Sequence, residues 1–150
     1  MAYRPHIIDA QQVFSDDEII NLMPKNFVFI ARLIKVENAL NLIDAFGGTK
    51  IYIPVRQALN VNSELAQVIG LSKLQLLSDQ LGNDHIEIPM GTPITVAMRN
   101  RQIRELAKKR VSKESLARKF GVTLRSIRGI VNTEEKLQVR QDPNLDLFSE

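Results

Sequence analysis

Residues 112–131 constrain the fold more than any other stretch, because they have the spacing of a helix-turn-helix. Apolar residues recur at helical intervals on both sides of Gly121, which can adopt the left-handed backbone that a tight turn between two helices requires. Ser112 and Thr123 stand where the two helices would begin, and each side-chain oxygen can accept a hydrogen bond from an unpaired backbone N–H. The pattern predicts two short helices, the second with the geometry of a DNA recognition helix.

Basic residues concentrate in the same part of the chain. The net charge is only +3, but residues 98–131 hold eleven Lys and Arg and two Glu, while acidic residues are in excess on either side. Arg125 and Arg128 lie three residues apart, so they share the outer face of the predicted second helix. A basic block that coincides with a helix-turn-helix pattern indicates a protein that binds nucleic acid.

The predicted second helix carries the residues that would read DNA. Arg125 and Arg128 can each make a bidentate contact to guanine, worth on the order of 1–3 kcal/mol of discrimination. Thr123 is placed to hold a phosphate through its hydroxyl and a backbone N–H, and Leu124 continues the apolar stripe of the helix. Gly129 costs about 1 kcal/mol relative to Ala; close approach to DNA, close approach to a neighbouring helix and sequence drift each explain it.

The composition excludes several kinds of site. The 150-residue chain is 44% apolar, enough for a core, and it has no Cys, so neither a disulfide nor a thiolate zinc site is possible. His6 and His85 are the only histidines, and the sequence contains neither a metal-ligand spacing nor a phosphate-binding glycine loop. We therefore predict a protein that is not an enzyme and that uses no cofactor and no metal.

The N-terminal sequence lacks the apolar segment of a signal peptide, and no apolar run in the chain is long enough to span a bilayer. The missing cysteines agree with a reducing compartment. These features predict a cytoplasmic protein without a membrane partner.

The residues before the helix-turn-helix alternate between helical and extended patterns. Ser15 and Glu18 have the spacing of a capping box, which predicts a short helix that ends before Pro24. Apolar residues at helical spacing predict one continuous helix over residues 27–46 and another over residues 63–81, each stopped by a glycine turn. A four-residue strand that ends in Ile-Pro follows each of these helices.

These two helix–strand units form an internal repeat. Residues 33–55 align with residues 68–90 at a shift of 35 without gaps, and seven aligned positions are identical. A single short strand would expose its whole backbone, so we expect the two strands to pair as an antiparallel ribbon whose isoleucine face the helices cover. The alternative is chance similarity between two ordinary helix–turn–strand stretches.

A basic helix precedes the helix-turn-helix. Thr92-Pro93 has the pattern of a cap followed by a proline in the first turn, and it predicts a helix from residue 93 to about residue 110. Two interpretations of this helix stay open. Either Arg101, Arg104 and Lys108 contact DNA phosphates, or the helix is a surface element whose apolar side faces the core; both can hold at once.

These patterns predict a mostly α protein with a short antiparallel β-ribbon, built from an N-terminal α/β association domain and a C-terminal helix-turn-helix. The predicted parts are an N-terminal arm (residues 1–14), the association domain with its internal repeat (15–91), the helix-turn-helix domain (92–131) and an acidic tail (132–150). The sequence leaves open whether the ribbon forms within one chain or between two chains.

Two segments carry a resemblance to a known family. Residues 47–54 read Gly-Gly-Thr-Lys-Ile-Tyr-Ile-Pro, which resembles the Gly-Gly-x-x-[Val/Ile]-Tyr-Ile-Pro segment of the Mor transcription activator family, the middle-operon regulators of Mu-like phages. Residues 120–123, Phe-Gly-Val-Thr, resemble the aromatic-Gly-Val-Thr turn in the helix-turn-helix of the same family. The resemblance covers roughly residues 27–60 and 100–131, and residues 61–97 look like an insertion in it.

The resemblance implies an N-terminal dimerisation domain with a short strand from each subunit. It also implies a C-terminal helix-turn-helix that binds promoter DNA and helps to recruit RNA polymerase. The predicted DNA-binding residues are Thr123, Arg125, Ser126, Arg128, Arg118, Lys119, Lys113, Arg101 and Arg104.

We therefore predict a sequence-specific, double-stranded-DNA-binding transcription regulator, a Mor-like activator of phage or mobile-element origin. Because helix-turn-helix proteins usually bind two half-sites one helical turn apart, we also predict a homodimer. Two alternatives remain: a helix-turn-helix that serves as a protein-interaction module, or the DNA-binding subunit of a recombination or partition complex.

Overall fold

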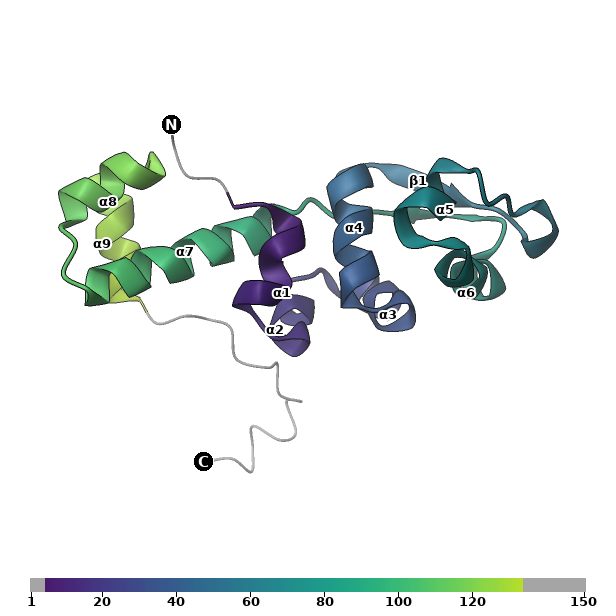
Figure 1. The fold of residues 1–150 in the computed structure, drawn as a ribbon, viewed down its shortest axis with the longest axis horizontal. Helices are drawn as coiled ribbons and strands as arrows, with labels where there is room; N and C mark the ends of the chain where they lie inside the picture. Colours follow the sequence, from purple (N-terminus) through teal and green to yellow (C-terminus); the bar gives the residue numbers. More distant parts are fainter. Residues whose placement is uncertain (1–4, 134–150) are drawn as a thin grey trace, which may run out of the picture.

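The computed structural model describes residues 5–133, which are mostly helical with one two-stranded antiparallel ribbon (Figure 1). The predicted fold class is confirmed. In chain order the elements are η1 (Ile7–Asp9), α1 (Ala10–Val13), α2 (Asp16–Asn21), α3 (Lys25–Ile34), α4 (Val36–Phe46), β1 (Lys50–Ile53), η2 (Arg56–Ala58), α5 (Glu64–Ile69), α6 (Leu71–Leu81), β2 (Asp84–Glu87), α7 (Thr92–Lys108), α8 (Lys113–Phe120) and α9 (Leu124–Asn132). Apart from residues 132 and 133, the predicted acidic tail lies outside the described residues.

Two hydrophobic cores are joined by α7. The larger core extends from η1 to the first half of α7, which contributes Ile94 and Met98. The smaller core contains Ile103 from the second half of α7 together with residues of α8 and α9. Figure 1 shows α7 running from the N-terminal helices toward α8 and α9. The two predicted domains therefore share this helix.

The first turns of the chain follow the predicted capping box but not the predicted arm. The Ser15 Oγ accepts from the Glu18 backbone N–H, and the Glu18 carboxylate accepts from the Ser15 backbone N–H at 3.0 Å. The helix that this box begins, α2, ends before Pro24 as predicted. Residues 7–13 of the predicted arm form η1 and α1 instead, and Ile7, Ala10 and Phe14 are buried in the larger core.

Two of the long helices that the sequence predicts are each broken once. Lys35, with φ 75° and ψ 153°, separates α3 from α4, and Gly70, with φ 87° and ψ 149°, separates α5 from α6. The predictions of continuous helices over residues 27–46 and 63–81 are therefore wrong. In both cases the break lets two shorter helices pack against each other. Because one residue with positive φ leaves the spacing of apolar residues almost unchanged, this spacing does not reveal the break. At α7, the cap is Gly91 rather than Thr92.

The ribbon forms within one chain. β1 pairs antiparallel with β2, and Ile51 stands opposite Ile86. Because Ile86 is also the position that corresponds to Ile51 at the shift of 35, an approximate twofold axis passes through this pair. Ile53, Ile86 and Ile88 are buried beneath the helices, as expected for a ribbon with one covered face.

The two helix breaks generate a stability prediction. A lysine at φ 75° adopts a backbone region that strongly favours glycine, so Lys35→Gly should raise the free energy of unfolding by about 1 kcal/mol. Gly70→Ala should lower it by a similar amount, because a Cβ at Gly70 meets nothing within 4 Å and the effect is purely conformational. Urea unfolding followed by circular dichroism measures both. As a control, Lys73→Gly inside α6 should be destabilising; a destabilising Lys35→Gly would contradict the assigned backbone.

Candidate nucleic-acid interface

The helix-turn-helix ends are set by the residues that the sequence singled out. Ser112 Oγ accepts from the Ser115 N–H at 3.1 Å at the start of α8, and Thr123 Oγ1 accepts from the Ser126 N–H at 3.0 Å at the start of α9. Between them Gly121 adopts the left-handed conformation, φ 66° and ψ 35°. The predicted caps and turn are confirmed, and they fix where the second helix begins.

A small apolar core holds α9 against its neighbours. Ile103, Leu116 and Ile127 are fully buried, and Phe120 is nearly so. These side chains come from α7, α8 and α9, and each of these helices contacts the other two. The buried Ile127 therefore fixes which side of α9 faces inward.

Arg125, Ser126 and Arg128 are exposed to solvent on α9. They lie away from the side of the helix that Ile127 buries, so two guanidinium groups project from a firmly held helix. Leu124 is only half-buried, although the sequence pattern predicts it in the apolar stripe. This arrangement of α9 meets the geometric requirement for a helix that enters a DNA groove.

The Thr123 hydroxyl serves the helix cap. It accepts from the Ser126 N–H and also donates to the Ser126 Oγ, which is 2.9 Å away. In the chain without DNA, this hydroxyl is therefore engaged in hydrogen bonds to Ser126. The structure brings Thr123 and Ser126 together as one capping unit, a pairing that the sequence analysis did not anticipate although Ser stands at the third residue after the cap.

Three further predicted cations lie exposed on α8: Lys113, Arg118 and Lys119. The Lys119 ammonium is 5.8 Å from the centroid of the Phe120 ring, which is part of the small core. Because α8 packs directly on α9, these charges belong to the same end of the molecule as the α9 arginines.

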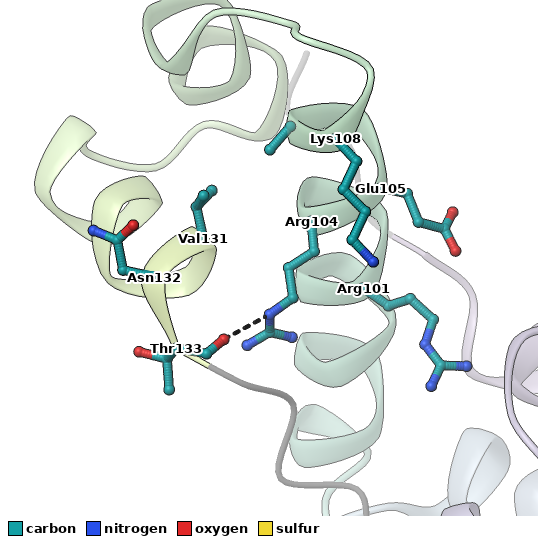
Figure 2. Close-up of a pocket in the computed structure, with 8 residues that line it drawn as sticks. Arg101, Arg104, Glu105, Lys108, Val131, Asn132 and Thr133 are labelled. Carbon is teal, nitrogen blue, oxygen red and sulfur yellow. Dashed lines mark hydrogen bonds between the residues drawn. The ribbon is translucent and has the colours of Figure 1, made fainter.

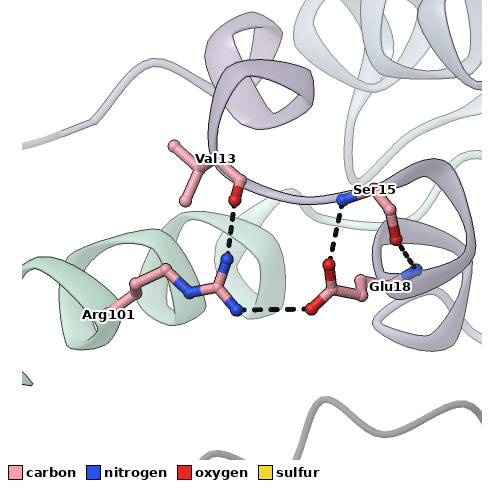
Figure 3. A network of polar contacts seen from close by, with 4 residues as sticks. All are labelled: Val13, Ser15, Glu18 and Arg101. Carbon is pink, nitrogen blue, oxygen red and sulfur yellow. Dashed lines mark hydrogen bonds and ion pairs between the residues drawn. The ribbon is translucent and has the colours of Figure 1, made fainter.

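Arg101 is used inside the protein. Its guanidinium donates to the Val13 carbonyl oxygen at 2.6 Å and pairs with the Glu18 carboxylate at 3.3 Å (Figure 3). It also lies 4.3 Å from the centroid of the Phe14 ring. The side chain is only 24% exposed. Arg101 therefore fastens α7 to the first turns of the chain, and the interpretation of Arg101 as a phosphate contact does not fit this burial.

Arg104 also contacts the protein itself. Its Nε donates to the carbonyl oxygens of Ile130 at 3.0 Å and Thr133 at 3.1 Å, and Figure 2 shows it reaching from α7 to the end of α9. A cation at the C-terminal end of a helix satisfies free carbonyls and complements the helix dipole. The pocket of about 660 Å³ beside it is lined by Arg101, Arg104 and Lys108 of α7 and by the end of α9.

Within residues 5–133, no group of three or more His, Asp or Glu side chains is arranged to hold a metal ion. No helix in the same range combines the length and apolar composition that crossing a bilayer requires.

Comparison with known families decides the class of protein. The sequence model of the Mor transcription activator family matches residues 55–145, more than half of the chain and all of the helix-turn-helix. The chain belongs to the Mor transcription activator family. The resemblance seen in the sequence is confirmed, and the chain is a transcription regulator of a family of activators rather than of enzymes. No curated protein and no solved structure matches the chain.

The range that the Mor model matches begins at Val55, after β1, and runs through residues 61–97. The matched range therefore includes residues 61–97, which the sequence pattern predicts to be an insertion. The unit of α5, α6 and β2 lies inside the match, and the unit of α3, α4 and β1 precedes it. The Gly-Gly-Thr-Lys-Ile-Tyr-Ile-Pro segment of residues 47–54 therefore lies just before the matched range.

Glu18 makes stability depend on pH. The hydrogen bond from the Ser15 backbone N–H, supported by the Ser15 hydroxyl and the Arg101 charge, lowers the pKa of Glu18 below its ordinary value of 4.5 despite partial burial. A carboxyl with a lowered pKa in the folded state stabilises above its unfolded pKa, and this contribution disappears as the pH falls through the folded value.

We therefore expect Glu18→Gln to reduce the free energy of unfolding at pH 7 and to make a shrinking difference below about pH 4.5. Denaturant unfolding at a series of pH values measures this difference. Glu37→Gln, at an exposed position on α4, is the matched control. A Glu18→Gln effect that stays constant from pH 7 to pH 3 would contradict the assigned ion-pair network.

Nothing in the described residues explains why position 129 is a glycine. It is exposed on α9, and a Cβ built there meets nothing within 4 Å, so close approach to a neighbouring helix is excluded as its explanation. Gly129→Ala should raise the free energy of unfolding by about 0.5–1 kcal/mol, because Ala is the better helix former. Thermal unfolding tests this; destabilisation would show that α9 is not a regular helix at this position.

Proposed function

We propose that this transcription regulator binds double-stranded DNA sequence-specifically by placing α9 in the major groove. The observation that carries the proposal is the solvent-exposed pair Arg125 and Arg128 on a helix whose opposite side is anchored by the fully buried Ile127. An anchored helix keeps its arginines at a fixed spacing, as base-edge contacts require.

The arginines of α9 supply sequence preference in this proposal, and the neighbouring cations supply affinity. Lys113, Arg118 and Lys119 are exposed on α8 and would lie against phosphates, where they release bound counterions. Arg101 and Arg104 are left out of the contact set, because their guanidinium groups hold α7 to Val13 and to the end of α9. The exposed N-terminal turn of α9 remains available for a phosphate through backbone N–H groups.

The effect on transcription, the location in the cell and the origin of the protein belong to the same proposal, and they rest on its family membership. The family is one of transcription activators, so we propose activation of a promoter with help to RNA polymerase, in a cytoplasmic protein of phage or mobile-element origin. On DNA we expect two copies of the chain on two half-sites about one helical turn apart.

Removing either α9 arginine should weaken specific binding. We expect Arg125→Ala and Arg128→Ala each to lower affinity for a selected duplex by roughly 5- to 150-fold, which corresponds to about 1–3 kcal/mol. Fluorescence anisotropy with a site selected from a random pool measures this. The salt dependence of binding should change little in these variants, because the proposed arginine contacts are to base edges and not to phosphates. Arg32→Ala, an exposed arginine on α3, should change little.

Two results would count against the proposal. If the unmodified chain does not bind duplex DNA even at low salt, the helix-turn-helix is a protein-interaction module instead. If it binds but the α9 variants keep the same preference among duplexes, α9 is not the recognition helix. Gly129→Ala adds a finer readout: reduced DNA affinity with raised stability indicates that Gly129 permits close approach to the duplex.

A further inference from the structure

We propose that the free protein is a monomer. Its two helix–strand units (α3, α4 and β1; α5, α6 and β2) already pair with each other within one chain, so neither strand needs a partner from a second chain. Each chain then carries a single helix-turn-helix, and two copies of the chain meet only when DNA presents two half-sites. The statement about DNA rests on the proposed function; the statement about the free chain does not.

The backbone of the two units is equivalent at positions 35 residues apart. Lys35 and Gly70 break their helices with nearly the same dihedral angles, φ 75° and ψ 153° against φ 87° and ψ 149°. In the turn before each strand, Gly48 and Asn83 both have positive φ, 81° and 67°. Lys35 thus has the same backbone conformation as the equivalent Gly70, although this conformation favours glycine. This agreement indicates that the two units share one architecture.

The contacts between the units are reciprocal. The Gly48 N–H donates to the Ile88 carbonyl oxygen at 2.8 Å, and the equivalent Asn83 N–H donates to the Ile53 carbonyl oxygen at 2.7 Å. The helices obey the same rule, since α3 packs on α6 and α4 packs on α5. The two units therefore bury against each other the surfaces that one unit alone would expose.

Other contacts between the units occur in one direction only. The Tyr52 hydroxyl donates to the Asn83 side-chain oxygen at 2.8 Å, and the Tyr52 ring lies 5.2 Å from the ring of His85. The corresponding partners at the other end of the ribbon are Glu87, Gly48 and Lys50, which cannot reproduce these contacts. A ribbon made from two copies of β1 would place Tyr52 opposite Lys50 rather than opposite His85.

Two further one-way contacts join the segment after β1 to α6. Arg56 forms an ion pair with Asp79 at 3.0 Å, and the Ser78 hydroxyl donates to the Pro54 carbonyl oxygen at 2.7 Å. The positions equivalent to Arg56 and Ser78 are Gly91 and Ile43, which lack these groups. The two units are therefore complementary to each other, but neither unit is complementary to a second copy of itself. This favours pairing of the two different units within one chain over pairing of two like units from different chains.

The absence of cysteine from the chain makes a disulfide test clean. Lys50 and Glu87 lie opposite each other and are both exposed. The adjacent Ile88 N–H donates to Thr49 O, so Lys50 and Glu87 form a closely spaced, non-hydrogen-bonded pair that suits a disulfide.

In the full-length K50C/E87C variant, mild oxidation should consume both thiols and leave a chain that runs as a monomer on a non-reducing gel. Light scattering of the unmodified protein should give a mass near 17.0 kDa. An equimolar mixture of the single variants K50C and E87C, oxidised together, is the control and should yield little covalent dimer. A disulfide-linked dimer from the double variant, free thiols in a folded double variant, or twice the monomer mass would overturn the proposal.

Binding stoichiometry tests the second half of the proposal separately. A duplex with one selected half-site should bind one chain, and a duplex with two half-sites should bind two, as measured by light scattering of the complexes. Two chains bound to the duplex with a single half-site would overturn the proposal that two copies meet only when DNA presents two half-sites. Failure to bind any duplex would reject the proposed function. The mass of the free protein and the disulfide result would still test, independently, whether the two units pair within one chain.

Discussion

The arrangement of this protein depends on one helix, α7, which contributes buried residues to both hydrophobic cores. Ile94 and Met98 belong to the larger core and Ile103 to the smaller one, so a helix rising about 1.5 Å per residue sets the distance between the cores. Arg101 stands between these buried residues and holds the first turns of the chain through Val13 and Glu18. The orientation of the helix-turn-helix relative to the ribbon follows from these contacts.

The basic block of the sequence separates into two groups in the structure. Arg101 and Arg104 are turned inward and join elements that are far apart in the chain. Arg125, Arg128 and the cations of α8 are turned outward and surround the exposed side of the helix-turn-helix. Charge density alone could not distinguish the groups, because the first is defined by carbonyl and carboxylate partners that only the folded chain brings near.

Much of the helix-turn-helix could be predicted from the sequence, because caps and turns are decided by neighbouring residues such as Ser112, Gly121 and Thr123. The break at Lys35 could not be predicted locally, since lysine is a good helix former and only tertiary packing overrides its preference. The repeat did contain a signal for this break, because Lys35 aligns with Gly70. The contact of Arg101 with Val13 spans 88 residues and leaves no trace in local periodicity.

The central claim, that the arginine side of α9 is the surface that meets DNA, is tested most directly by nuclear magnetic resonance of the labelled full-length chain titrated with a selected duplex. The account predicts that the largest amide shift changes lie at Arg125, Ser126 and Arg128, with smaller ones on α8, while the ribbon amides of Ile51 and Ile86 stay unchanged. Shift changes confined to the ribbon or to α1 and α2, with α9 unaffected, would contradict it.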